Sequence, residues 1–246
     1  MNESSTPMRI AMWSGPRNIS TAMMRAWGTR PDTFVCDEPF YAYYLKTTGA
    51  DHPLAEEIIE HHESDAGAVI DWLTGEVPNG KAVFYQKQMT HHLLPGVDRD
   101  WIGQVTNCFL IREPREMLTS YIKKVSNPTL EDLGMPQQVE IFESVRNSTG
   151  AIPPVLDAKD VLDDPPRMLG LLCEALELPF TESMLSWPPG PRATDGIWAK
   201  HWYDRVVETT TFAPYQPKPD EVPPELEALH RECQDLYDRL YEHRLR

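Results

Sequence analysis

The residues best placed to do chemistry form a polar turn near the N-terminus, Gly15-Pro16-Arg17-Asn18-Ile19-Ser20-Thr21. An apolar run, residues 10–13, precedes this turn, and apolar residues at helical spacing follow it as far as Gly28. The pattern predicts a strand, a tight turn and a helix that Asn18 can cap. Backbone N–H groups and the positive end of the helix dipole then point at one place, where Arg17 adds a charge. The stretch predicts a binding loop for phosphate or sulfate.

Ordinary α/β construction remains the alternative interpretation, because a strand, a polar turn and a helix occur in succession in many proteins without binding anything. The turn has no Gly-Lys-Ser/Thr after a spaced glycine, and no GxGxxG pattern is present. The standard nucleotide loops for ATP and for dinucleotides are therefore not predicted here.

Further candidate residues follow the next two predicted strands. The strand over residues 33–36 ends in Asp37 and Glu38, and the strand over residues 82–85 is followed by Lys87 and then by His91 and His92 in a turn. The carboxyl ends of parallel strands are where open α/β sheets bind ligands. A histidine there suits general-base catalysis because its ordinary pKa is near neutral. A solvated acidic turn and structural histidines are the alternatives.

A fourth strand, predicted over residues 106–111, ends in Arg112. Pro114 opens the helix that follows, as proline favours the first helical turn, and that helix carries Ser120. Arg112 and Ser120 can both reach the same edge of the sheet.

The composition restricts the possible partners. The chain has 246 residues, 41 % of them hydrophobic, and a net charge of −15, which argues against a nucleic-acid or anionic-membrane partner. The cysteines are scattered and have no metal-ligand spacing, and no signal or transmembrane run is present, so a soluble, cytoplasmic protein with reduced thiols is expected. We predict one domain over residues 1–246, with a last helix over about 225–245 docked on the core. A monomer and a homodimer both remain possible.

Three stretches together resemble the sulfotransferases that use 3′-phosphoadenosine 5′-phosphosulfate (PAPS). Pro16–Thr21 is similar to the family's loop around the 5′-phosphosulfate, with Arg17 where the family has its catalytic Lys or Arg. Phe109–Pro114, with Ser120 eight positions after Arg112, resembles the segment that binds the 3′-phosphate. Residues 161–180 resemble the family's C-terminal helical signature. Three motifs in the family's order are a far more specific signal than one.

The resemblance implies an α/β fold of three layers, a central parallel β-sheet flanked by helices, of the P-loop NTPase-like, sulfotransferase type. It implies PAPS as the co-substrate, no metal, and a hydroxyl or amine of a small acceptor as the sulfuryl acceptor. Gly15 to Thr21, Arg112 and Ser120 would bind the donor. Arg17, with or without Lys87, would stabilise the leaving oxygen. His91 or His92 would be the base, with Glu38 as the competitor.

Departures from the family's pattern leave two other functions open. Ile19 replaces the family's loop glycine, and Ala158 stands where relatives often have a tyrosine that contacts the adenine. The family's Arg-Lys-Gly segment near the C-terminus is absent, with Arg192 or Lys200 as candidate substitutes. A nucleotide-binding module without catalysis is therefore one alternative. A related P-loop-type phosphotransferase is the other.

Overall fold

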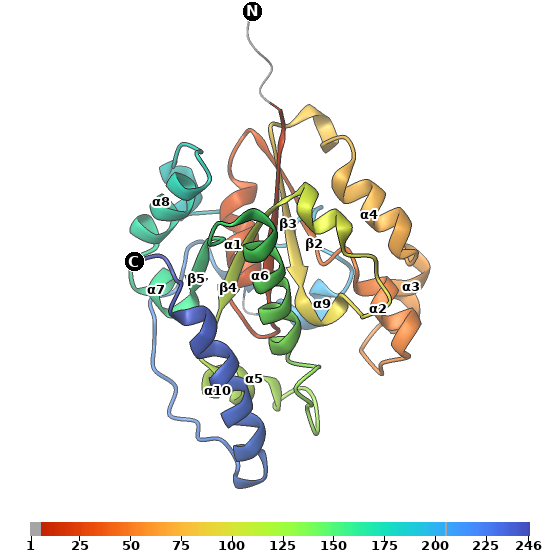
Figure 1. Ribbon diagram of the computed structural model, residues 1–246, viewed down its shortest axis with the longest axis vertical. Coiled ribbons are helices and arrows are strands. Elements are labelled where there is room, and N and C mark those ends of the chain that lie inside the picture. The colour runs from red at the N-terminus through yellow and green to blue at the C-terminus, as the bar shows by residue number, and fades with distance from the viewer. Residues whose placement is uncertain (1–5, 205) are drawn as a thin grey trace, which may run out of the picture.

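A sheet of five parallel strands forms the centre of the protein in the computed structural model, which describes residues 6–204 and 206–246 (Figure 1). The strand order is β2-β3-β1-β4-β5, so β1 lies in the middle, between β3 and β4. The chain passes to one side of β1 for the earlier strands and to the other side for the later ones, which makes the carboxyl end of β1 a topological switch point. The strands are β1 (Met8–Ser14), β2 (Thr33–Asp37), β3 (Val83–Met89), β4 (Thr106–Ile111) and β5 (Val155–Asp157).

Helices cover both faces of the sheet, which confirms the predicted three-layer α/β fold. Side chains from α4, α5, α6 and α10 pack on one face, and side chains from α1, α7 and α8 pack on the other. Two apolar cores result, one on each side of a sheet whose strands are buried. The helices are α1 (Ser20–Gly28), α2 (Tyr41–Thr48), α3 (Ala55–His61), α4 (Ala66–Thr74), α5 (Pro114–Tyr121), α6 (Met135–Thr149), α7 (Ala158–Asp163), α8 (Pro165–Ala175), α9 (Ala199–Trp202) and α10 (Glu227–Tyr241).

The strand boundaries differ from the prediction where polar residues are buried. The strand predicted over 106–111 is confirmed as β4, and α1 ends at Gly28 as expected. The strand predicted over 82–85 instead continues to Met89, so Lys87 lies inside β3 and not after it. Hydrophobic periodicity stops at polar residues, but Gln86 is buried because its amide donates to the Leu73 carbonyl oxygen at 2.8 Å. A satisfied polar side chain can occupy a strand interior without leaving an apolar signal.

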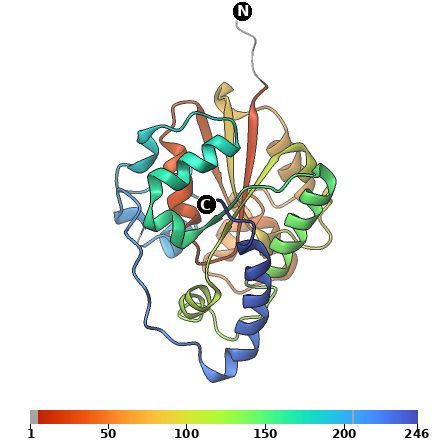
Figure 2. The ribbon, with the colours of Figure 1, turned by 60° about the vertical axis from the view of Figure 1, so that its left-hand side comes forward.

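Two groups of elements lie near the carboxyl ends of the strands. Beside β2, side chains of α2, α3 and the segment around α9 form a third, smaller apolar cluster. Beside β4, the extended segment 213–222 descends past α5 before the chain turns into α10 (Figure 2). The helix α10 then packs against α6 and α5.

The four cysteines are buried and form no disulfide, as the sequence predicts for reduced core residues. Within the described part of the chain, no helix is both long and apolar enough to cross a membrane.

Candidate functional site

The predicted anion loop connects β1 to α1 at the switch point of the sheet. Gly15 is buried, and a Cβ atom at this position would lie only 2.7 Å from the Leu133 carbonyl oxygen, so the close approach of the two backbones requires glycine. Arg17 adopts a positive φ of 56°, which turns the backbone sharply before α1 begins at Ser20. The loop therefore directs the N-terminus of α1 toward the carboxyl edge of the sheet, as an anion site requires.

Asn18 fastens this loop to the sheet instead of capping the helix. The N-cap position of α1 is Ile19, and no side chain caps the helix there, so the predicted cap is wrong. The Asn18 amide donates to the Leu110 carbonyl oxygen at 2.9 Å, and its Oδ1 accepts the Ile19 N–H at 2.8 Å. The short Asn18 side chain thus forms hydrogen bonds with a backbone carbonyl of β4 and with the backbone N–H of Ile19, because the turn places it beside both.

The tertiary structure brings Arg17, Arg112 and Ser120 together. The Arg17 Nε donates to the Ser120 Oγ at 3.2 Å, and the Arg112 Nη1 donates to the Arg17 carbonyl oxygen at 2.6 Å. All three side chains are half-buried. Two guanidinium groups and a hydroxyl thus meet at the loop, although about a hundred positions separate Arg17 from the other two in the chain.

A carboxylate on α5 and a tyrosine of the segment 213–222 complete this group. The Arg112 Nη2 pairs with the buried Glu116 Oε2 at 2.9 Å, and the Tyr215 hydroxyl donates to Glu116 Oε1 at 2.7 Å. Burial would raise the pKa of Glu116, but the hydrogen bonds from Tyr215 and Arg112 outweigh it and lower the pKa. Sequence reasoning missed Glu116 and Tyr215. The one available signal for Glu116 was its position four residues after Arg112, at the start of the predicted helix.

A cavity of about 340 Å³ opens beside Arg112. Ala158 and Lys159 of α7 line it on one side, and residues of α10 line it on the other. The segment 213–222 is held next to it, because the Arg115 Nη1 donates to the carbonyl oxygens of Lys218 and Asp220, each at 3.0 Å. By contrast, Lys200 lies against Glu57 of α3, at 3.6 Å.

A second polar cluster is centred on Lys87, on the face of the sheet that α1 covers. The Lys87 ammonium is 1 % exposed and donates to Asp37 Oδ1 at 2.8 Å, to Glu38 Oε1, and to the Tyr203 hydroxyl at 2.7 Å. Burial alone would lower the pKa of Lys87, but Asp37 and Glu38 raise it well above its ordinary value. The ammonium is therefore charged, and each of its three N–H groups has an acceptor.

The predicted bases lie next to this cluster. Glu38 Oε2 is 4.0 Å from the Nδ1 of His92, and burial raises the pKa of Glu38. Burial lowers the pKa of His91 to about 3 and that of His92 well below its ordinary value. The His92 ring stacks on Tyr41 and Tyr44, with ring centres 4.6 and 4.8 Å apart. Both histidines are thus neutral rings in an aromatic wall.

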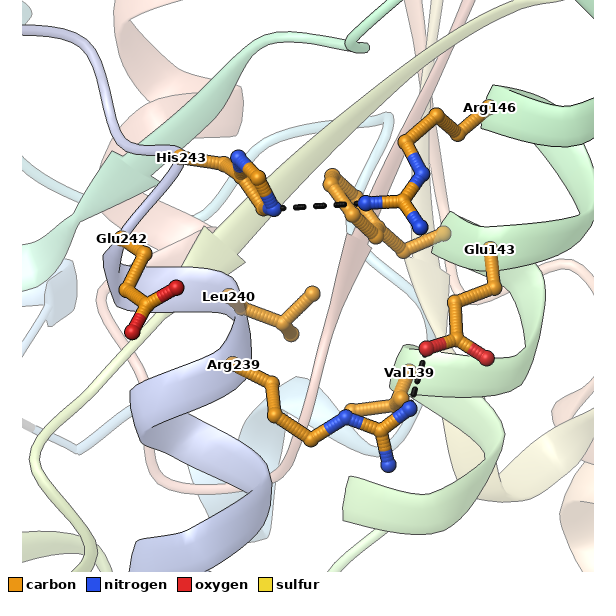
Figure 3. A pocket seen from close by; sticks show the side chains of 8 residues that line it. Val139, Glu143, Arg146, Arg239, Leu240, Glu242 and His243 are labelled. Atoms are coloured by element: carbon orange, nitrogen blue, oxygen red, sulfur yellow. Dashed lines mark hydrogen bonds and ion pairs between the residues drawn. The ribbon is translucent and has the colours of Figure 1, made fainter.

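A second depression lies between α6 and α10 (Figure 3). Its volume is about 160 Å³. Arg239 pairs with Glu143, and the Arg146 Nη1 lies 3.4 Å from the Nε2 of His243 (Figure 3). These charged groups bind one another, so this depression is a packing feature of the two helices. Among the described residues, no group of three His, Cys, Asp or Glu side chains is placed to hold a metal ion.

Residues 8–233 match the model of the sulfotransferase domain, so the chain belongs to the sulfotransferase-domain family. Its curated relatives include two proteins of Arabidopsis thaliana, the branched-chain-amino-acid aminotransferase-like proteins 2 and 1. They are 34 % and 35 % identical to it over 94 % and 96 % of this chain. The chain spans only 41 % and 42 % of the length of these two relatives.

Solved structures of sulfotransferases share the fold. The sulfotransferase domain of the Synechococcus PCC 7002 olefin synthase aligns over 100 % of this chain and 98 % of its own, with a TM-score of 0.59 and 15 % identity. The sulfotransferase of Alicyclobacillus acidocaldarius aligns over 98 % of both chains, with a TM-score of 0.52 and 11 % identity. The fold is therefore the P-loop-like α/β fold of sulfotransferases, as the sequence predicts.

Proposed function

We propose that this protein transfers the sulfuryl group of PAPS to a hydroxyl or amine of a small acceptor. The observation that supports this most strongly is the meeting of Arg17, Arg112 and Ser120 at the loop after β1, in a member of the sulfotransferase-domain family. In the family these positions bind the phosphates of the donor. A loop with two guanidinium groups and a helix N-terminus fits a ligand that carries several anionic groups.

The donor would lie along the loop and the neighbouring cavity. The backbone of Gly15 to Ile19, with the Ser20 and Thr21 side chains, would hold the 5′-phosphosulfate. Arg112 and Ser120 would hold the 3′-phosphate, beside the 340 Å³ cavity. The segment 213–222, bound to Arg115 through its carbonyl oxygens, would replace the missing Arg-Lys-Gly segment. This role suits it better than Lys200, which pairs with Glu57 elsewhere.

In the reaction, the bond between sulfur and the bridging oxygen breaks, and a bond between sulfur and the acceptor oxygen or nitrogen forms. Arg17 would stabilise the negative charge that develops on the bridging oxygen. The acceptor's proton would pass to Glu38. Among the three candidate bases Glu38 is favoured, because a histidine with a pKa of about 3, such as His91, is too weak a base near neutral pH. His92 would orient the acceptor beside Glu38.

The first test is calorimetric titration with the product nucleotide, 3′-phosphoadenosine 5′-phosphate (PAP), with ATP as the control ligand. We expect PAP to bind at micromolar concentration and ATP not to bind. Arg17→Ala and Arg112→Ala should bind PAP much more weakly while keeping the fold, and Arg239→Ala, in the depression between α6 and α10, should bind PAP normally. If both loop variants bind PAP as the wild type does, the site assignment is wrong. Mg²⁺-dependent ATP consumption would instead support a phosphotransferase.

The second test is transfer from ³⁵S-labelled PAPS to a panel of small alcohols and amines. The net charge of −15 and the carboxylates of Asp37 and Glu38 favour neutral or cationic acceptors over anionic ones. Labelled product from any acceptor would support sulfuryl transfer. PAP binding with no product from any acceptor would support a nucleotide-binding module without catalysis.

A further inference from the structure

Tyr203 joins the Lys87 cluster from a distant part of the chain. Its hydroxyl lies 2.7 Å from both carboxylate oxygens of Asp37 and accepts a hydrogen bond from the Lys87 ammonium, also at 2.7 Å. The Lys87 Nζ lies 5.1 Å from the centre of the Tyr203 ring. Because the phenol donates to Asp37 while it accepts from Lys87, the three groups form one hydrogen-bonded chain in a buried site.

Buried contacts fix the segment that carries Tyr203. Asp195 forms a two-pronged ion pair with Arg25 of α1, with N–O distances of 2.5 and 2.7 Å, and both side chains are less than 5 % exposed. The Gly196 N–H donates to Asp37 Oδ2 at 3.2 Å. The segment is thus bound both to the helix that begins at the anion loop and to the end of β2. Such paired and hydrogen-bonded contacts are well suited to hold Tyr203 in one place.

Glu38 shares the Lys87 ammonium with Asp37 and Tyr203. One oxygen of Glu38 accepts from Lys87, and the same oxygen lies 3.5 Å from the Tyr203 hydroxyl. The other oxygen faces His92 and has no closer partner than that 4.0 Å contact among the described residues. Five groups therefore surround Glu38: Lys87 from β3, Asp37 from β2, Tyr203, the neutral His92 and Tyr41. Burial raises the pKa of Tyr41, and the nearby Glu38 raises it further.

We propose that Asp37 and Tyr203 form a positioning pair that shares the Lys87 ammonium with Glu38, so that the ammonium charge is divided among three acceptors and Glu38 keeps one oxygen able to accept the acceptor's proton. This inference rests on the proposed function, which gives Glu38 the role of base. In this arrangement Lys87 acts through Glu38, because all three N–H groups of the ammonium are hydrogen-bonded within the cluster. A carboxylate paired with an unshared lysine would be a much weaker base.

Replacing Asp37 changes the pKa of Glu38 in a stated direction. Asp37→Asn removes a like charge from the vicinity of Glu38 and leaves more of the ammonium charge to Glu38, and both effects lower the pKa of Glu38. Tyr203→Phe removes a hydroxyl that shares Lys87, but it also removes the 3.5 Å contact from that hydroxyl to Glu38, which itself lowers the pKa of Glu38, so the two effects oppose each other and the net change should be small. Tyr85→Phe is the matched control, because the buried Tyr85 hydroxyl, two positions before Lys87 on the same face of β3, has no hydrogen-bond partner among the described residues.

The experiment is an NMR titration of the full chain labelled with ¹³C at the glutamate carboxyl groups, with the Glu38 signal assigned by Glu38→Gln. We expect Asp37→Asn to lower the titration midpoint of Glu38 by about one pH unit, Tyr203→Phe to change it much less, and Tyr85→Phe to leave it unchanged. An unmoved or raised midpoint in Asp37→Asn would overturn the inference. If Asp37→Asn does not fold, Asp37→Ser, which removes the same charge, decides in its place by the same criterion.

The titration needs neither donor nor acceptor, so it separates this inference from the proposed function. Once an acceptor is found, the acid limb of the pH–rate profile should move to lower pH in Asp37→Asn by the same amount as the midpoint of Glu38. Shifted midpoints in a protein that binds no PAP would contradict the proposed function alone. Unshifted midpoints in an active enzyme would contradict the positioning pair alone.

Discussion

Two clusters in this protein have the same parts and different exposure. In one, the Lys87 ammonium donates hydrogen bonds to Asp37 and to the Tyr203 hydroxyl. In the other, the Glu116 carboxylate accepts hydrogen bonds from Arg112 and from the Tyr215 hydroxyl. Each consists of a cation, a carboxylate and a tyrosine hydroxyl that the last third of the chain supplies. The Lys87 side chain is 1 % exposed, whereas that of Arg112 is 15 % exposed and lines a cavity.

This difference in exposure separates two uses of the same chemistry. Water and ligands cannot replace the partners of a fully buried cation, so the Lys87 cluster keeps its arrangement and changes the proton affinity of its neighbours. Arg112 can share its guanidinium with a ligand anion, because one side of it faces the cavity. We therefore expect the Lys87 cluster to determine stability and proton transfer, and the Arg112 cluster to determine donor affinity.

The largest effect is expected from Lys87→Met. This substitution leaves Asp37 and Glu38 buried without their counter-charge, and breaking a buried pair in this way costs about 3–5 kcal/mol of folding free energy. Urea denaturation measures the loss. Lys200→Met, which removes an exposed ammonium from its pair with Glu57, is the control and should leave the unfolding free energy unchanged. A Lys87→Met protein as stable as the wild type would contradict the distinction between the clusters.

Arg112→Ala should weaken PAP binding by about 2 kcal/mol, roughly 30-fold, because a charged hydrogen-bond donor to the ligand is lost. The free energy of unfolding should change less than in Lys87→Met, since Tyr215 still donates to Glu116. Calorimetric titration measures the affinity. The comparison fails if Arg112→Ala costs more stability than Lys87→Met and leaves PAP affinity unchanged.

The two tyrosines give the most closely matched comparison. Tyr203→Phe should cost about 2 kcal/mol of stability, because it leaves the buried Lys87 and Asp37 each short of a hydrogen bond. Tyr215→Phe should cost less than about 1 kcal/mol, because Glu116 keeps its ion pair with Arg112 and lines the cavity. Thermal and urea denaturation of the two variants side by side measure the difference, and equal losses would show that exposure does not distinguish the clusters.

Acidification should lower the free energy of unfolding through His91 and His92, which lie beside the Lys87 cluster. His91 and His92 are neutral when folded, with lowered pKa values, so the unfolded chain takes up protons below the ordinary histidine pKa of 6.5 and the folded protein does not. The contribution of the two histidines to stability is complete above pH 6.5 and decreases as the pH falls below it, by roughly 1 kcal/mol per pH unit for each histidine; for His91 the decrease continues down to its folded pKa of about 3.

Two carboxylates, those of Glu38 and Glu116, also make the stability depend on pH. The raised pKa of Glu38 opposes the trend, since that group stabilises the fold at low pH and loses this contribution as the pH rises through its folded pKa. Glu116, with a lowered pKa, contributes above its ordinary value of 4.5 and loses the contribution below it. Urea denaturation between pH 7 and 5 tests the histidines. His92→Phe should flatten the decrease, whereas His61→Ala, at an exposed position, should not.

The sequence by itself predicted the order of strands and helices around the loop, and it singled out the residues that we propose for the donor side. Gly15 to Thr21, Arg112 and Ser120 were found from local patterns, because turn residues, strand ends and helix starts leave short-range signals. The three-layer fold followed from the same alternation of apolar strands and amphipathic helices. The roles of these donor-side residues and of the three candidate bases remain predictions for the titrations to test.

Only the tertiary structure decided which distant groups are partners and which of them are buried. The sequence predicts Lys87 just after a strand, whereas the structure places it inside β3 with its ammonium paired with Asp37 of β2. Tyr203 and Tyr215 lie in irregular or extended segments, where no sequence pattern indicates their partners. A buried charge is stable only when its partners lie in place, and those partners come from other strands and from the C-terminal third of the chain. Local periodicity records which residues avoid water. It does not record which charge will neutralise which other, because that depends on contacts between residues far apart in the chain, such as Lys87 and Asp37, which are 50 positions apart.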